Sequence, residues 1–65
     1  MSNLDFENKR LELLKRSNIL LEKTKNHFKQ YQEERKLLFK LSTDTSIDYE
    51  LWEKILDCLE VLIER

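Results

Sequence analysis

The chain of 65 residues contains no glycine and no proline. These two residues supply most of the backbone conformations that hairpin turns, tight loops and phosphate-cradling loops require. Their absence argues against β-hairpins and against Gly-rich nucleotide sites. Cys58 is the only cysteine, which excludes a disulfide within the chain, and His27 is the only histidine. With so few nitrogen and sulfur ligands, we expect no metal site and no cofactor.

Long apolar runs are also missing. Nothing in the sequence resembles a signal peptide or a transmembrane stretch of about 18 apolar residues. We therefore expect a soluble, intracellular protein that is cytoplasmic, with a nuclear location left open, and no membrane partner. A lone cysteine fits a reducing compartment.

The residues that are present are mainly apolar (40%) and charged (38%), and the net charge is −1. This small total conceals an asymmetry. Residues 1–41 carry ten Lys or Arg and six Asp or Glu, a net +4, whereas residues 42–65 carry two and seven, a net −5. The basic part and the acidic part are therefore expected to pack against each other.

Residues 3–41 have the apolar periodicity of one continuous amphipathic helix, at about 100° per residue. A helix of this length is about 58 Å long, at about 1.5 Å per residue. Ser2 is a suitable N-cap for it. Residues 22–36 are mostly polar, and Asn26-His27 has modest helix propensity, so this is the place where a break would occur. Such a break would give a three-helix bundle instead.

The run Ser42-Thr43-Asp44-Thr45-Ser46 predicts the loop, because small polar side chains compete for backbone hydrogen bonds. A second helix then covers about residues 48–65, with Asp48 as its N-cap. Its apolar residues span a broad arc of roughly 160°, which implies contact with more than one helix. Cys58, Trp52 and Tyr31 are interpreted as core residues, and His27 as a surface or boundary residue.

The prediction is thus an all-α fold in a single domain of residues 1–65. It is an antiparallel helical hairpin with a long first helix, about 3–41, and a shorter second helix, about 48–65. The second helix covers only half of the first, and the uncovered apolar stripe predicts packing into an oligomeric helical bundle. The stripe defines the predicted partner-binding residues: Phe6, Leu13, Leu14, Ser17, Leu20, Leu21 and Thr24.

We expect a non-enzymatic protein–protein interaction module that uses this stripe. Its partner would be a second copy of the chain, giving a homo-oligomer, or another helical protein for which it serves as an adaptor or assembly subunit. One alternative is a small regulator that docks on a larger enzyme or transcription factor and inhibits it. An enzyme is not expected, because no nucleophile, base and oxyanion donor are set together by two helices.

Lys9, Arg16 and Lys23 lie seven residues apart along one flank of the first helix. A basic flank can neutralise phosphates, so a further alternative is an RNA- or DNA-binding hairpin that uses these three residues. Against it stands the net charge of −1, which lacks the basic excess that such proteins usually have.

Overall fold

The computed structural model describes the backbone of residues 3–64 and the side chains of residues 5–64. The described residues form three α-helices and contain no strand: α1 is Asn3–Thr24, α2 is Gln32–Thr43 and α3 is Tyr49–Ile63. A single turn of 3-10 helix, η1 (Lys25–His27), follows α1 directly. The all-α fold predicted from the sequence is confirmed, but the arrangement differs from the predicted hairpin.

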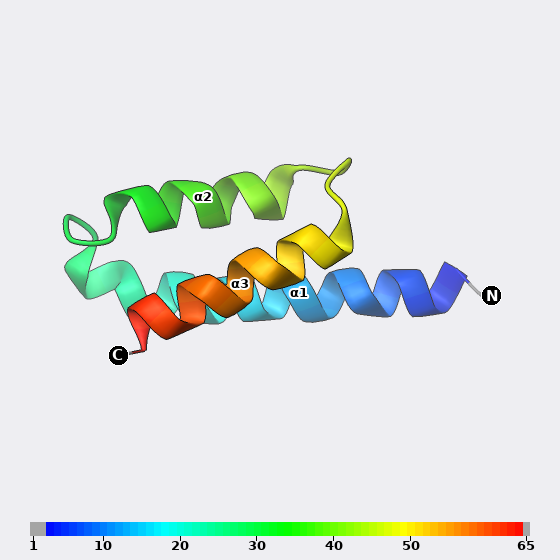
Figure 1. The fold of residues 1–65 in the computed structure, drawn as a ribbon, viewed down its shortest axis with the longest axis horizontal. Helices are drawn as coiled ribbons and strands as arrows, with labels where there is room; N and C mark the ends of the chain where they lie inside the picture. Colours follow the sequence, from blue (N-terminus) through cyan, green and yellow to red (C-terminus); the bar gives the residue numbers. More distant parts are fainter. Residues whose placement is uncertain (1–2, 65) are drawn as a thin grey trace.

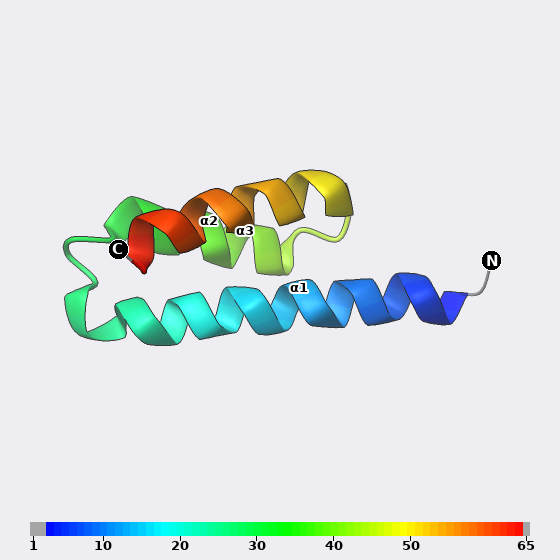
Figure 2. The ribbon, with the colours of Figure 1, turned by 60° about the horizontal axis from the view of Figure 1, so that its bottom comes forward.

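Each helix reverses the direction of the one before it (Figure 1). The views in Figures 1 and 2 place α2 and α3 alongside α1, and they show the N-terminal part of α1 projecting beyond both. The longest dimension of the molecule is 41 Å. That length is shorter than the roughly 58 Å of a straight helix over residues 3–41.

The predicted continuous helix over residues 3–41 is wrong, because α1 ends at Thr24 and the chain folds back before Gln32. The break occurs in the polar stretch around Asn26 that the sequence marked as the weakest point. Carbonyls at the end of a helix need new partners. Here the hydroxyl of Thr24 donates to the carbonyls of Leu20 and Leu21, at 3.0 and 3.1 Å. The guanidinium of Arg35 donates to the carbonyl of Leu21 as well, at 2.7 Å.

Folding back gives the apolar stripe of α1 a cover within the same chain. One core joins all three helices and consists of Leu13, Leu20, Leu38, Leu41, Trp52, Leu56 and Leu59. Five of these seven side chains lie on α2 or α3, which fold back alongside α1. Burial of the apolar stripe therefore favours the turn, although no residue in it is a strong helix breaker.

The second predicted helix is confirmed closely. Asp48 has an extended backbone and its carboxylate accepts the backbone N–H of Glu50 at 2.9 Å, so it is the N-cap of α3 as expected. In the preceding loop, the carboxylate of Asp44 accepts both the backbone N–H and the hydroxyl of Ser46, and these bonds lower the pKa of Asp44. The helix ends at Ile63, before the predicted end at Arg65. Arg65 and the predicted cap Ser2 lie outside the described residues.

Candidate interaction surface

The seven residues predicted to bind a partner divide into three groups. Leu13, Ser17, Leu20 and Thr24 are fully buried within the single chain. Leu14 and Leu21 are half-buried and pack against the core. Only Phe6 stays largely exposed, at 65%. A second chain was expected because the second helix would cover only half of the first. That reason no longer holds, because α2 and α3 cover the apolar stripe of α1 within one chain.

The two buried polar side chains have structural roles. The indole N–H of Trp52 donates to the hydroxyl oxygen of Ser17 at 3.1 Å, and that hydroxyl donates to the carbonyl of Leu13 at 2.9 Å. The hydroxyl of Thr24, which donates to the carbonyls of Leu20 and Leu21, accepts a hydrogen bond from the guanidinium of Arg35 at 2.8 Å. These partners are needed because a buried polar group without a hydrogen bond is costly. These bonds position α3 and α2 on α1.

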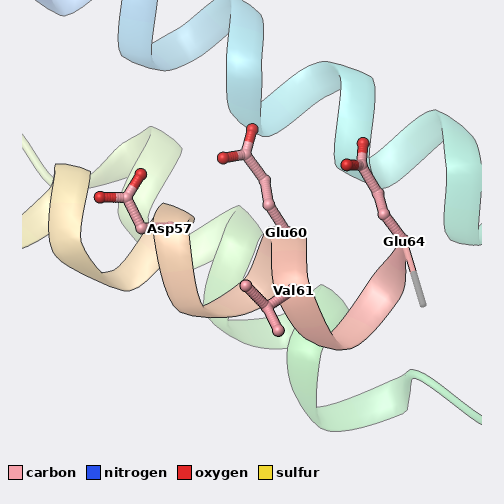
Figure 3. Close-up of a pocket in the computed structure, with 4 residues that line it drawn as sticks. All are labelled: Asp57, Glu60, Val61 and Glu64. Carbon is pink, nitrogen blue, oxygen red and sulfur yellow. The ribbon is translucent and has the colours of Figure 1, made fainter.

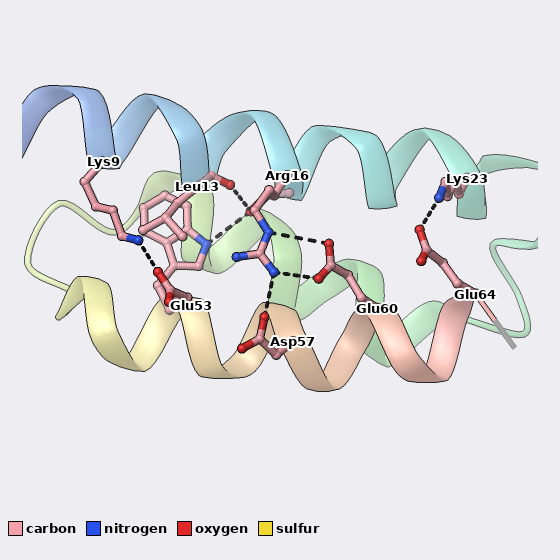
Figure 4. Close-up of polar contacts among 10 residues, drawn as sticks. Lys9, Leu13, Arg16, Lys23, Glu53, Asp57, Glu60 and Glu64 are labelled. Carbon is pink, nitrogen blue, oxygen red and sulfur yellow. Dashed lines mark hydrogen bonds and ion pairs between the residues drawn. The ribbon is translucent and has the colours of Figure 1, made fainter.

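The cations of the predicted nucleic-acid flank face α3. Lys9 pairs with Glu53, Arg16 with Asp57 and Glu60, and Lys23 with Glu64 (Figure 4). The arrangement confirms that the basic and the acidic parts of the chain pack together. It also neutralises each of the three cations, so the flank has no excess charge with which to bind phosphates.

Arg16 is the centre of this row. Its Nη2 lies 2.5 Å from a carboxylate oxygen of Glu60 and 2.7 Å from one of Asp57. Hydrogen bonds first to Glu60 and then to Asp57 raise the pKa of the Arg16 guanidinium above its ordinary value. The hydrogen bond to Glu53 raises the pKa of Lys9 in the same way. Because one guanidinium serves two carboxylates, its loss also leaves those two acids facing each other.

We expect Arg16→Met to destabilise the fold by about 1 kcal/mol, the upper end for ion pairs near the surface. The loss should shrink at high salt, since screening weakens exposed pairs. Urea unfolding at low and high ionic strength measures both effects. The matched control is Lys15→Met, which removes the same charge from an exposed position next to it. Equal losses in the two variants would contradict a specific role for Arg16.

At the projecting end of α1, the ring of Phe6 stacks on that of Tyr49, with 4.5 Å between the centroids. Tyr49 in turn meets the edge of Trp52 at 6.1 Å. An open groove of about 700 Å³ lies here, lined by Asp5, Phe6, Lys9, Ile47, Asp48, Tyr49, Glu50 and Glu53. The aromatic pair contacts the core through Trp52, so it fastens this end of α1 to α3.

The surface of α3 carries a second apolar row, most of which stays exposed in the folded chain. Trp52, Leu56, Leu59 and Ile63 recur at intervals of four, three and four residues and face the core. Leu51, Ile55, Cys58 and Leu62 repeat the same intervals one residue earlier, and we call these four the outer row. Leu51 is 52% exposed, Leu62 is 50% exposed, and Cys58 is exposed. Ile55 is half-buried and packs against the core.

The outer row corrects one prediction and explains another. Cys58 was expected in the core, but its thiol is exposed because the adjacent row, with Leu59, faces inward. The broad apolar arc of this helix predicted contact with more than one helix. Its inner residues pack in the core shared with α1 and α2, and the outer row accounts for the rest of the arc. The outer row could have been identified from the sequence, because the same four-three-four spacing occurs twice on this helix, in two adjacent rows. The folded chain offers this helix only α1 and α2 to pack against.

Val61, 63% exposed, widens the outer row on its solvent side. It borders a shallow depression of about 380 Å³ that it shares with Asp57, Glu60 and Glu64 (Figure 3). The same three carboxylates pair with Arg16 and Lys23 of α1. The depression is thus the outer side of the ion-pair row, and its acids are already engaged.

Within residues 3–64, no group of three or more His, Cys, Asp or Glu side chains is placed to hold a metal ion. No helix in this part of the chain has the length and apolar character needed to cross a membrane. Comparison of the chain with protein-family models, with curated proteins and with solved structures finds no match.

Proposed function

We propose that this protein is a non-enzymatic protein–protein interaction module that presents the outer row of α3 to an amphipathic helix of another protein. The observation that carries the proposal is the second apolar row on α3, which remains at the surface after the core has formed. Exposed apolar side chains arranged contiguously mark interaction sites more often than scattered ones do. A row with four-three-four spacing matches the apolar face of a partner helix.

The surface now proposed differs from the stripe of α1 predicted from the sequence. Burial of Leu13 and Leu20 gives that stripe to the core. Among the apolar side chains that stay exposed, those of the outer row of α3 share one face of a single helix, whereas Phe6, Phe28 and Phe39 lie in three different segments. Leu11 and Ile19 on α1 are also exposed, but they lie eight residues apart and form no row with each other. They provide matched control positions for a test.

The test selects helical peptides that bind the folded chain from a displayed library of amphipathic sequences. Affinities are then compared in Leu51→Glu/Leu62→Glu and in the control Leu11→Glu/Ile19→Glu. Burying the exposed half of a leucine contributes about 1 kcal/mol, so removing two should weaken binding at least tenfold, and buried charge adds to this. The control should bind as the parent does.

Circular dichroism establishes first that both variants keep their helical content, since all four positions are largely exposed. Peptides that bind the α3 variant as tightly as the parent would refute the proposed surface. So would a selection that returns no binder, or binders that only the α1 variant loses.

A further inference from the structure

The turn between α1 and α2 contains nothing that forbids a helix. Residues 25–31 hold no glycine or proline, and no residue in the described chain has a positive φ. Thr24 has φ −96° and ψ −2°, Phe28 has φ −65° and ψ −26°, and Tyr31 has φ −108° and ψ 29°. Thr24 and Phe28 lie within about 40° of helical values, whereas Tyr31 would change its ψ by about 70° to become helical. All three have a negative φ, so none of them would have to leave a left-handed conformation for the turn to straighten.

Contacts between α1 and α2 hold the turn closed. Arg35 of α2 donates to the carbonyl of Leu21 and to the hydroxyl of Thr24, and Leu38 and Leu41 pack in the core. None of these contacts depends on the two helices belonging to one chain. If the turn straightens, a second copy can supply α2 and α3 to the exposed face of α1, and the same core is rebuilt between chains.

The register of α1 on α2 locates the symmetry axis of such a pair. In a two-fold exchange between antiparallel helices, the numbers of the two residues in each α1–α2 contact average to the number of the residue that lies at the symmetry axis. The contact of Arg35 with Leu21 gives (21 + 35)/2 = 28, and its contact with Thr24 gives (24 + 35)/2 = 29.5. The axis therefore passes beside Phe28, where two copies of this ring would meet.

The position of Phe28 in the sequence is typical of a residue that packs in a core. It continues the seven-residue spacing of Leu14 and Leu21, which both pack against the core. On a straight helix it lies only about 20° from Leu21, since seven steps of about 100° fall just short of two turns. At the tip of the closed turn, however, it is 57% exposed. Straightening would transfer this aromatic side chain from solvent into an interface.

From these observations we infer that the chain forms a domain-swapped dimer with a second copy of itself. Residues 3–43 become one helix in each chain, the two long helices run antiparallel, and each chain's α2 and α3 pack on the α1 of its partner. The core contacts are conserved, the turn gains helical hydrogen bonds, and two Phe28 rings become buried. Dimer formation costs translational and rotational entropy, so the dimer fraction rises with protein concentration. This inference does not rest on the outer row of α3.

The test separates exchange from any other dimer by an intrachain distance. Spin labels are attached to Lys15→Cys and Lys40→Cys in a Cys58→Ser background; both lysines are exposed. In the closed chain, the labels lie on neighbouring helices, whose axes are about 10 Å apart. In the exchanged dimer they are 25 residues apart on one straight helix, about 37 Å. A tenfold excess of unlabelled chain ensures that the measured distance lies within one chain.

Dimer and monomer fractions are separated by size-exclusion chromatography after incubation at millimolar concentration. We expect the long distance in the dimer and the short one in the monomer. Asn26→Ala/His27→Ala raises the helix propensity of two exposed turn residues and should increase the dimer fraction at least tenfold, whereas Phe28→Ser should lower it tenfold. A dimer that keeps the short distance, or the absence of any dimer in Asn26→Ala/His27→Ala, would overturn the inference. Leu51→Glu/Leu62→Glu should leave the dimer fraction unchanged, so failure of one proposal is distinguishable from failure of the other.

Discussion

Trp52→Ala should leave the chain largely unfolded at 25 °C. Trp52 is the largest fully buried side chain, it contacts Tyr49 by its edge, and its N–H donates to the buried hydroxyl of Ser17. Truncating a buried tryptophan costs about 3–5 kcal/mol, and a single core in a chain of this size supplies about the same net stability. Far-UV circular dichroism with a thermal scan measures the loss, and it does not depend on the only tryptophan as a fluorophore.

The matched control is Leu51→Ala, the preceding residue on the same helix. Leu51 belongs to the outer row and is half exposed, so its truncation should cost less than about 1 kcal/mol. A Trp52→Ala chain that still melts cooperatively, within a few degrees of the parent, would show that Trp52 does not occupy the centre of the core.

Leu20→Ala should destabilise the fold by about 2–5 kcal/mol, the range for truncating a fully buried leucine. This variant tests the reversal of the chain after Thr24. With α2 and α3 folded back, Leu20 has neighbours on every side and its truncation leaves a cavity. In a monomeric hairpin with one continuous first helix, Leu20 would lie near the end of the cover and its truncation would cost little. Urea unfolding followed by circular dichroism measures the difference.

Ile19→Ala serves as the control, since Ile19 is the adjacent residue and is 47% exposed. The two substitutions change helix propensity by a similar small amount, so the difference between them reports burial. A cost for Leu20→Ala that is no greater than that for Ile19→Ala would contradict the three-helix arrangement.

The local features of the fold could be predicted from the sequence, because each depends on residues close together in the chain. The absence of glycine and proline and the helical periodicity led to an all-α fold. The run of small polar residues placed the loop before α3, and Asp48 was identified as its cap. Opposite net charges in the two parts of the chain correctly indicated that α1 and the last helix would pair.

The turn at residues 25–31 was not predictable with the same certainty. Its polar composition allows a helix and allows a break, and the local energies of the two differ little. What separates them is the burial of Leu13 and Leu20, which depends on whether α2 and α3 of the same chain can reach α1. The candidate surface follows from the same decision. Once α1 is covered, the outer row of α3 remains at the surface as a row of apolar side chains on one helix face.

The sequence alone therefore determined the all-α class, the loop and cap before α3 and the apolar face of each helix, because these follow from propensity, capping and spacing within a few turns. Only the tertiary structure decided which apolar faces cover one another. Ser17 and Thr24 illustrate the difference: their positions on the stripe could be counted from the sequence, but their partners, Trp52 and Arg35, are brought to them by two reversals of the chain.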